Sequence, residues 1–218
     1  MEKFCQRGVL ESKNLSQLSP VLCDSNFQED FVVYDVCRGE NQKEGLRYDL
    51  TRIHPRLLNG ELAKTFGHYH LNNEPELYEV LSGEALFFIQ RYGKNPLIIE
   101  EAFLIEGRER EKIIIPPHFS MTTINKNSTR DLIAGNWVSA AIKNEYGSFQ
   151  KTRGAAYYIV LKENGEIITE KNKNYQQVPE LVKLRPKALA PELNNLEFLL
   201  TPEKYANFLT IDNLYLRL

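Results

Sequence analysis

Residues 65–83 of the chain read TFGHYHLNNEPELYEVLSG, and the expected architecture follows from this stretch. His68 and His70 stand two residues apart, so their side chains face the same side if the segment is a strand. Glu76 opens the next run of apolar and aromatic residues, which ends at the turn residues Ser82-Gly83. Imidazole nitrogens and carboxylate oxygens are common ligands of divalent metals. The stretch therefore predicts short strands that carry a candidate metal site.

Short apolar runs separated by turn residues continue on both sides of this stretch. Strands are expected at residues 31–37, 48–53, 76–81, 85–90, 97–99, 112–115, 121–125, 132–138, 157–162 and 166–169. Asn164-Gly165, between the last two runs, is a strong signal for a tight hairpin. No long stretch between residues 31 and 170 has a helical period. This pattern predicts an all-β sandwich or barrel.

The two ends of the chain lack this strand pattern. The N-terminal residues are polar, and we expect residues 8–26 to form a loop or weak helix. Residues 171–200 are rich in Asn, Lys and Pro and predict a tail that wraps the barrel. Thr201 as the cap and Pro202 as the first residue predict a short helix over residues 202–209. The expected organisation is an N-terminal arm (1–30), a barrel (31–187) and a C-terminal extension (188–218).

Composition and charge exclude several classes of protein. The 218 residues are 42% hydrophobic and 26% charged, which excludes disorder across the whole chain. A formal charge of -2 argues against a nucleic-acid binder, and no apolar run approaches the roughly 20 residues that span a bilayer. The start shows no signal-peptide pattern, and Cys5, Cys23 and Cys37 resemble neither a disulfide framework nor a zinc cluster. We therefore expect a cytoplasmic protein with neither a nucleic acid nor a membrane as partner.

A second block of residues, Gly107, Pro116, Met121 and Asn125, follows the first. Together the two blocks resemble the cupin pattern, whose first motif supplies His, His and Glu and whose second supplies one further His. The match is closer to one branch, the cupin-type glucose-6-phosphate isomerases. It covers about residues 31–187 and rests on Val32-Val33-Tyr34-Asp35-Val36, Thr51, Thr65-Phe66-Gly67-His68-Tyr69-His70, Pro75 to Gly83, Ile115-Pro116-Pro117, Asn144-Glu145-Tyr146-Gly147 and Glu163-Asn164-Gly165-Glu166. The resemblance implies a cupin double-stranded β-helix, or jelly-roll barrel.

The resemblance also implies roles for particular residues. The family's functional positions match the metal ligands His68, His70 and Glu76, the phosphate-holding residues Thr51, Thr65 and Gly67, and the pocket tyrosines Tyr34 and Tyr78. Hydroxyls and a backbone N–H suit phosphate oxygens, which accept strong hydrogen bonds. The implied cofactor is a divalent metal, with iron(II) expected first and manganese, nickel or zinc as alternatives. The implied assembly is a homodimer.

This sequence departs from the family pattern at two positions. Met121 stands where the family has its fourth metal ligand, a His, and Asn144 stands where the family has a His near the sugar ring. His118 lies three residues before Met121, and we expect it to be an exposed turn residue. Two His and one carboxylate remain, which is the facial ligand set of non-haem iron sites.

The resemblance therefore implies a metal-dependent aldose–ketose isomerase that interconverts glucose 6-phosphate and fructose 6-phosphate. Glu76 is the candidate base of a cis-enediol route, and a metal-assisted hydride shift is the alternative. A second hypothesis is a sugar-phosphate-binding protein without catalysis, since Met121 and Asn144 replace histidines. A third is another cupin enzyme, such as an oxygenase or an epimerase. The candidate phosphate positions argue against the third.

Overall fold

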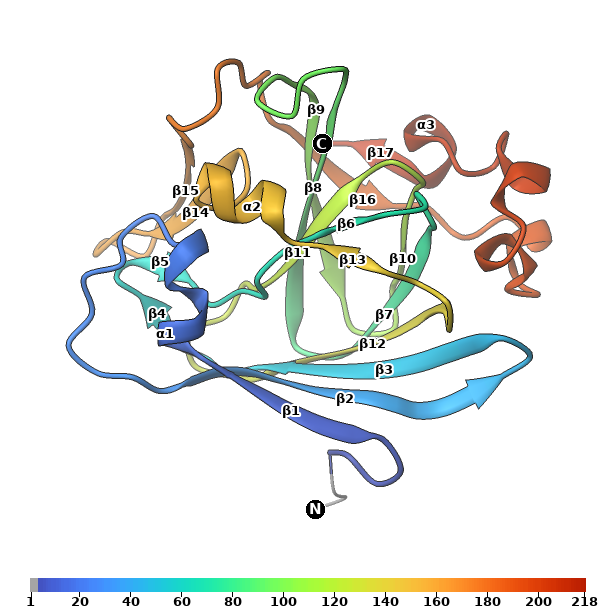
Figure 1. Cartoon of the computed structure of the whole chain (residues 1–218), viewed down its shortest axis with the longest axis horizontal. Coiled ribbons are helices and arrows are strands. Elements are labelled where there is room, and N and C mark those ends of the chain that lie inside the picture. The colour runs from blue at the N-terminus through green and yellow to red at the C-terminus, as the bar shows by residue number, and fades with distance from the viewer. Residues whose placement is uncertain (1–3) are drawn as a thin grey trace.

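The computed structural model describes residues 4–218, and its strands form two large sheets. The six-stranded sheet has the order β1 (Val9–Asn14), β2 (Val32–Lys43), β3 (Leu46–Ile53), β12 (Leu132–Ser139), β7 (Glu76–Ser82) and β10 (Lys112–Ile115). The five-stranded sheet has the order β11 (Ser120–Asn125), β8 (Glu84–Tyr92), β9 (Ile99–Arg108), β16 (Val182–Pro186) and β17 (Tyr215–Arg217). In Figure 1, β2 and β3 cross the lower part of the view, while β8 and β9 run upwards behind them. The expected jelly-roll barrel is confirmed.

The core lies between these two sheets. Strand β8 contains an apolar run over residues 85–89, in which Phe87, Phe88 and Ile89 are fully buried. Strand β10 places Ile113 and Ile115 in the same core. Burying side chains of this size contributes about 1.5–3 kcal/mol each. These buried strands hold in place the strand ends that carry the candidate site.

Two smaller sheets complete the β structure. One pairs β13 (Asn144–Glu145) with β6 (Tyr69–His70). The other has the order β15 (Ile167–Lys171), β14 (Tyr157–Leu161), β5 (Glu61–Leu62) and β4 (Leu57–Leu58). The hairpin expected at Asn164-Gly165 joins β14 to β15. A single short helix near them, α2 (Gly147–Thr152), covers one end of the barrel (Figure 1).

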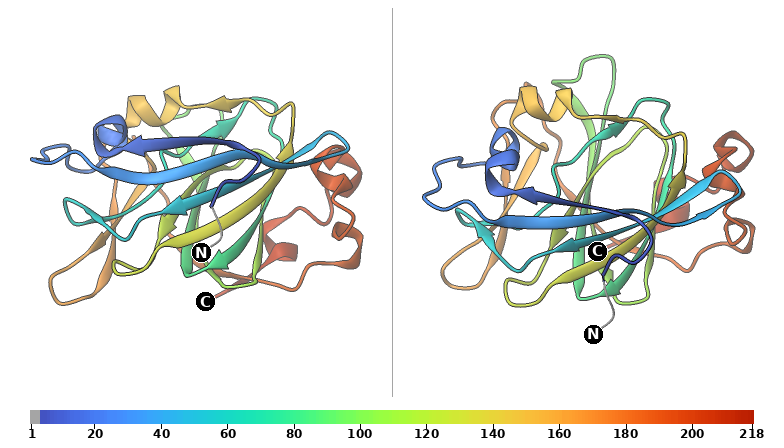
Figure 2. Two further views of the ribbon diagram at one scale, coloured as in Figure 1. Left: turned by 90° about the horizontal axis from the view of Figure 1, so that it is seen from below. Right: turned by 60° about the horizontal axis from the view of Figure 1, so that its bottom comes forward.

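Residues 9–14 of the N-terminal segment form a strand, where a loop or weak helix was expected, while residues 15–21 form short helical turns. Residues 1–3 of the expected arm lie outside the described residues. Strand β1 lies antiparallel to β2 at the edge of the six-stranded sheet (Figure 2), and α1 (Leu15–Leu18) with the 3₁₀ turn η1 (Ser19–Val21) follows it. The sequence of β1, VLESKN, shows no clear alternation because most of its side chains are partly or fully exposed. Residues 9–14 therefore form a strand because they pair with β2, since their own sequence has no strand pattern.

The C-terminal residues continue the five-stranded sheet. Strand β16 runs parallel to β9, and β17 pairs with β16. The remaining turns are η2 (Pro191–Leu193), η3 (Glu197–Leu199), η4 (Pro202–Tyr205) and α3 (Ile211–Leu214). Of the helix expected over residues 202–209, only η4 forms. The Thr201 hydroxyl donates to the Glu197 carbonyl and does not cap that turn.

The cysteine prediction is wrong for one pair. Cys5 and Cys37 form a disulfide across 32 residues of sequence, and Cys23 is free and exposed. The pairing depends on β1 lying beside β2, which brings the start of the chain to Cys37. Within residues 4–218, no helix is long and apolar enough to cross a membrane.

Candidate active site

The sequence-predicted residues meet at one pocket inside the barrel. Its walls come from β2, β3, β7, β11 and β12, from the segment before β6, and from residues 142–146. The pocket is lined by Tyr34, Thr51, Thr65, Gly67, His68, Glu76 and Tyr78. His70 adjoins it through its contacts with His68 and Glu76.

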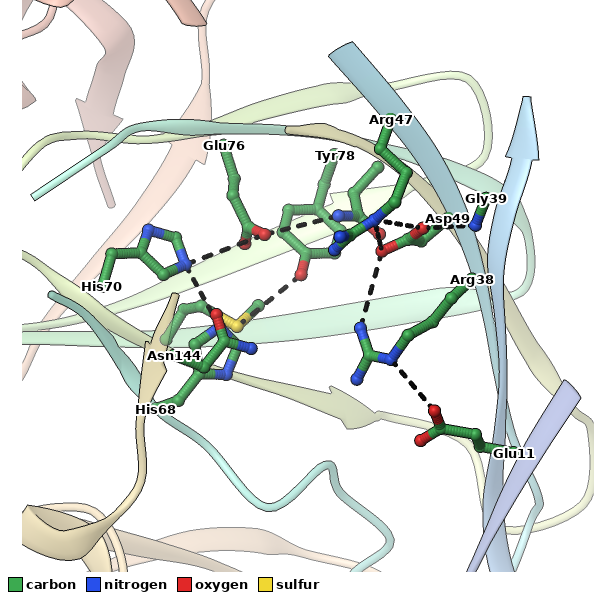
Figure 3. A network of polar contacts seen from close by, with 12 residues as sticks. Glu11, Arg38, Gly39, Arg47, Asp49, His68, His70, Glu76, Tyr78 and Asn144 are labelled. Atoms are coloured by element: carbon green, nitrogen blue, oxygen red, sulfur yellow. Dashed lines mark hydrogen bonds and ion pairs between the residues drawn. The ribbon is translucent and has the colours of Figure 1, made fainter. Parts of the chain in front are cut away.

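His68 and His70 point their ring nitrogens toward one another, as Figure 3 shows. Their Nε2 atoms are 3.1 Å apart. The Nδ1 of His70 lies 2.6 Å from the Glu74 carbonyl oxygen, to which it donates. That hydrogen bond leaves the Nε2 lone pair of His70 free for a metal, as is usual for metal-binding histidines. The alternation expected of a strand thus brings both imidazoles to one point.

Glu76 faces the two histidines from the start of β7. Its Oε1 lies 3.8 Å from the Nε2 of His70 and accepts a hydrogen bond of 3.4 Å from Asn136. Its Oε2 is buried and has no hydrogen-bond partner within the described residues. A buried carboxylate oxygen without a partner is costly unless a cation or proton satisfies it.

These three side chains fit a divalent metal. One ligand atom from each of His68, His70 and Glu76 lies within 4.8 Å of the others. Two nitrogens and one oxygen match the facial set that leaves further coordination positions open. The unpartnered Oε2 of Glu76 is the atom that an ion would satisfy.

Burial determines the protonation of these groups when no metal is bound. It raises the pKa of Glu76, and the charge of His70 acts in the opposite direction. It also lowers the pKa of His68 well below its usual range, with smaller contributions in the same direction from His70 and Arg38. His68 is therefore neutral at physiological pH, which is the form that binds a metal.

The two pocket tyrosines are hydrogen-bond donors. Tyr34 and Tyr78 are buried, and burial raises the pKa of both phenols above the usual value. Both are therefore neutral at physiological pH. The Tyr78 hydroxyl lies 3.7 Å from the sulfur of Met121, which is a weak acceptor.

The three phosphate candidates line the same pocket. The Thr65 hydroxyl accepts a hydrogen bond of 3.0 Å from the backbone N–H of Thr123, which leaves its own proton free to donate. Gly67 has a φ of +82°, and a Cβ there would lie 2.4 Å from the Thr122 hydroxyl and 2.5 Å from the Phe149 ring. A glycine is thus required where the backbone turns into the pocket.

The two departures from the family pattern also lie in this pocket. The backbones of Met121 and His68 exchange two hydrogen bonds, and the Met121 side chain is buried beside the site. Asn144 pairs with His70 between β13 and β6, and its side chain donates to the Tyr146 hydroxyl at 3.0 Å. His118 is exposed in the turn between β10 and β11, as expected, and does not line this pocket.

The sequence reasoning missed six polar residues of the pocket: Arg38, Arg47, Asp49, Thr123, Asn136 and Tyr146. Asp49 is buried and accepts hydrogen bonds of 2.9 and 3.0 Å from the Nε of Arg47 and one of 2.8 Å from the Gly39 N–H. The alternation of side chains along β2 and β3 could have identified Arg38 and Arg47. Arg38 is four residues from Tyr34 on β2, and Arg47 is four residues from Thr51 on β3, so each shares a face with a predicted site residue.

Arg52 and Lys64 are next to predicted site residues in sequence, but neither lines the pocket. The Nη2 of Arg52 donates to Asp35 at 2.6 Å, on the opposite face of the sheet. Lys64 is buried in an ion pair with Glu61 and donates to the Val21 carbonyl. Both cations therefore have structural partners.

The sequence matches known proteins over most of its length. A family model described as glucose-6-phosphate isomerase (GPI) matches residues 10–178. The chain belongs to this family. The glucose-6-phosphate isomerase of Thermococcus litoralis is 28% identical over 150 residues, which are 67% of this chain and 74% of that protein. The expected membership of the glucose-6-phosphate isomerase family is thus confirmed, and with it an isomerase-type protein.

Solved structures with similar folds include several cupins. A cupin-2 domain from Rhodospirillum rubrum is 9% identical, with a TM-score of 0.38, over 52% of this chain and 64% of that chain. An oxalate oxidase in complex with the substrate analogue glycolate is 16% identical, with a TM-score of 0.37, over 47% and 46% of the two chains. Vicilin from Solanum lycopersicum is 11% identical, with a TM-score of 0.39, over 52% and 31%. The chain spans less than two thirds of each, and the cupin fold follows from the strand order and the family.

Proposed function

We propose that this protein is a metal-dependent isomerase that interconverts glucose 6-phosphate and fructose 6-phosphate. One observation carries the proposal: His68, His70 and Glu76 converge in a pocket where the Glu76 Oε2 has no partner. The family and the name of the Thermococcus litoralis relative support the same substrate. Iron(II) is the first metal to test, followed by manganese, nickel and zinc, because two imidazoles and one carboxylate suit them all.

A metal held by His68, His70 and Glu76 would supply Lewis-acid polarisation of the sugar carbonyl. The pocket's own residues bind and orient the substrate. The Thr65 hydroxyl and the Gly67 N–H donate to the phosphate, together with the Thr51 hydroxyl. This anchoring lets binding energy from the phosphate hold the reacting carbons in place.

Glu76 is the group that moves the proton between C1 and C2 in the enediol route. Burial raises the pKa of Glu76 when no metal is bound, whereas coordination to a cation makes a carboxylate a weaker base. If the ion takes the unpartnered Oε2, the proton goes to Oε1, whose hydrogen bond from Asn136 is long at 3.4 Å. In a hydride-shift route Glu76 serves only as a ligand, so replacing it changes metal binding alone.

The test is turnover of glucose 6-phosphate by protein that has been stripped of metal and reloaded with one metal at a time. We expect activity to return with at least one divalent metal. Glu76→Gln should lower kcat by about 10²–10⁴-fold, the usual contribution of a positioned base, while the protein stays folded by circular dichroism. Full activity of Glu76→Gln would contradict the assignment.

Met121 favours one alternative function. With no imidazole as a fourth ligand, the same pocket would bind a sugar phosphate without converting it. Absence of turnover with every metal, together with a melting temperature raised by glucose 6-phosphate, would establish that alternative.

A further inference from the structure

The Arg38 guanidinium lies at the pocket wall with its donors uncommitted. Its Nη1 is 3.6 Å from the Oδ2 of Asp49, and its Nε is 3.6 Å from the Oε1 of Glu11. Both separations exceed hydrogen-bond length, and the side chain makes no hydrogen bond to residues 4–218. Figure 3 shows the guanidinium between these two carboxylates. Arg38 is thus held in position by charge while its N–H groups stay free.

The carboxylates near Arg38 leave its N–H groups without hydrogen bonds. Among the described residues that line the pocket, Arg38 and Arg47 carry positive charges, and Asp49 and Glu76 carry carboxyl groups. Arg47 and the Gly39 N–H already satisfy Asp49. The Glu11 side chain is 42% exposed, so water screens its charge. Because Asp49 takes its hydrogen bonds from Arg47 and Gly39, the N–H groups of Arg38 are available to an anionic ligand.

The fold places Arg38 near the candidate phosphate residues. Val36 pairs with Thr51 across β2 and β3, and Arg38 is two residues beyond Val36 on the same face. Two residues of a strand span roughly 7 Å, which an arginine side chain can bridge. Arg38 and Thr51 therefore line the same pocket from neighbouring strands.

We propose that Arg38 binds the phosphate group of the hexose phosphate, and that Asp49 and Glu11 are positioning residues for it. This inference rests on the proposed function. The neutral donors of Thr51, Thr65 and Gly67 can hydrogen-bond an alcohol as well as a phosphate. A guanidinium pairs with a dianion through charge and two parallel N–H bonds. Arg38 thus makes the pocket selective for phosphorylated over free hexose.

The experiment compares Arg38→Met with Arg52→Met. Both variants replace a partly exposed arginine of the same sheet, with side-chain exposures of 34% and 31%, but Arg52 faces away from the pocket. We expect Arg38→Met to raise the KM for glucose 6-phosphate by about 10- to 100-fold, the effect of losing a charged hydrogen bond. We expect kcat to change much less, and Arg52→Met to leave KM unchanged. Arg38→Lys should give an intermediate KM, because lysine keeps the positive charge but cannot donate two parallel N–H bonds to the phosphate.

A binding measurement separates this inference from the proposed function. Calorimetric titration of metal-stripped protein with glucose 6-phosphate and with glucose needs no turnover. Wild type should prefer glucose 6-phosphate, and Arg38→Met should lose most of that preference. If wild type binds or converts glucose 6-phosphate and Arg38→Met does so equally well, the inference is wrong and the proposed function stands. If wild type neither binds nor converts glucose 6-phosphate, the inference and the proposed function are both wrong. If Arg38→Met does not fold, Arg38→Lys replaces it in the same assays.

Discussion

Met121 lies beside the candidate metal site, where the family resemblance implies a fourth ligand. Its backbone exchanges two hydrogen bonds with the backbone of His68, and the residue is 2% exposed. Its sulfur faces the Tyr78 hydroxyl. A thioether is a soft, neutral ligand that suits iron(II) or manganese(II) poorly. The site therefore has three good ligands, with a methionine beside them where the family resemblance implies a fourth.

Met121→His should tighten metal binding, because it adds an imidazole beside the other three ligands. Competition against a chromophoric chelator measures the affinity. Met121→Leu is the matched control, since it keeps the apolar volume and removes the sulfur. Equal affinities for Met121→Leu and wild type are expected. A weaker affinity in Met121→Leu would show instead that the thioether itself is a ligand.

At the scale of elements, β1 is fastened to β2 at both ends. Near its start, the Cys5–Cys37 disulfide and the Glu40 carboxylate, which accepts from the N–H groups of residues 6–8, tie the chain to β2. Near its end, the Ser12 hydroxyl donates to Asp35 at 2.6 Å. Because β1 also carries Glu11, the attachment of this strand bears on the pocket.

Removing the disulfide with Cys5→Ala should lower the free energy of unfolding by about 4 kcal/mol, as expected for a crosslink that closes a loop of this length. Urea unfolding under oxidising conditions measures the loss. A reductant should destabilise the wild type by a similar amount and leave Cys5→Ala unchanged. If the reductant has no effect on the wild type, the bond does not stabilise the fold in solution.

At the scale of the whole molecule, Asp35 joins three strands on the outer face of the barrel. It accepts from Ser12 of β1 and Arg52 of β3, and its Oδ2 lies 3.2 Å from His54. Burial alone would raise the pKa of Asp35, but the hydrogen bonds from Ser12 and Arg52 and the nearby charges hold it below the usual value. The folded state therefore favours the ionised carboxylate.

This coupling predicts how stability depends on pH. A depressed pKa adds stability above the unfolded value, near 4, and that stability is lost as pH falls through the folded value. Asp35→Asn should lower the free energy of unfolding by roughly 2 kcal/mol at pH 7, since it removes charged hydrogen bonds. The difference from wild type should shrink below about pH 4. Urea unfolding at pH 7 and pH 3 tests this, and an equal difference at both values would contradict it.

The site was predictable where its residues are close in sequence. His68, His70 and Glu76 lie within nine residues of one another, and their convergence follows from strand alternation and one tight connection. Arg38 and Asp49 were missed because they come from other strands, and only the pairing of β2 with β3 brings them to the pocket. Of the helix expected over residues 202–209 only the 3₁₀ turn η4 forms, and the expected cap, Thr201, makes no capping hydrogen bond.

The local pattern alone determined the all-β class, the positions of most barrel strands and the two histidines that share a face. Side-chain alternation and turn chemistry are properties of a few neighbouring residues, so they can be recognised in the sequence. Tertiary structure alone decided that residues 9–14 form a strand, that Cys5 meets Cys37 and that Arg38 keeps free donors beside the site. Each of these depends on which strands are neighbours in a sheet. That order is set by the burial of side chains that are far apart in the sequence.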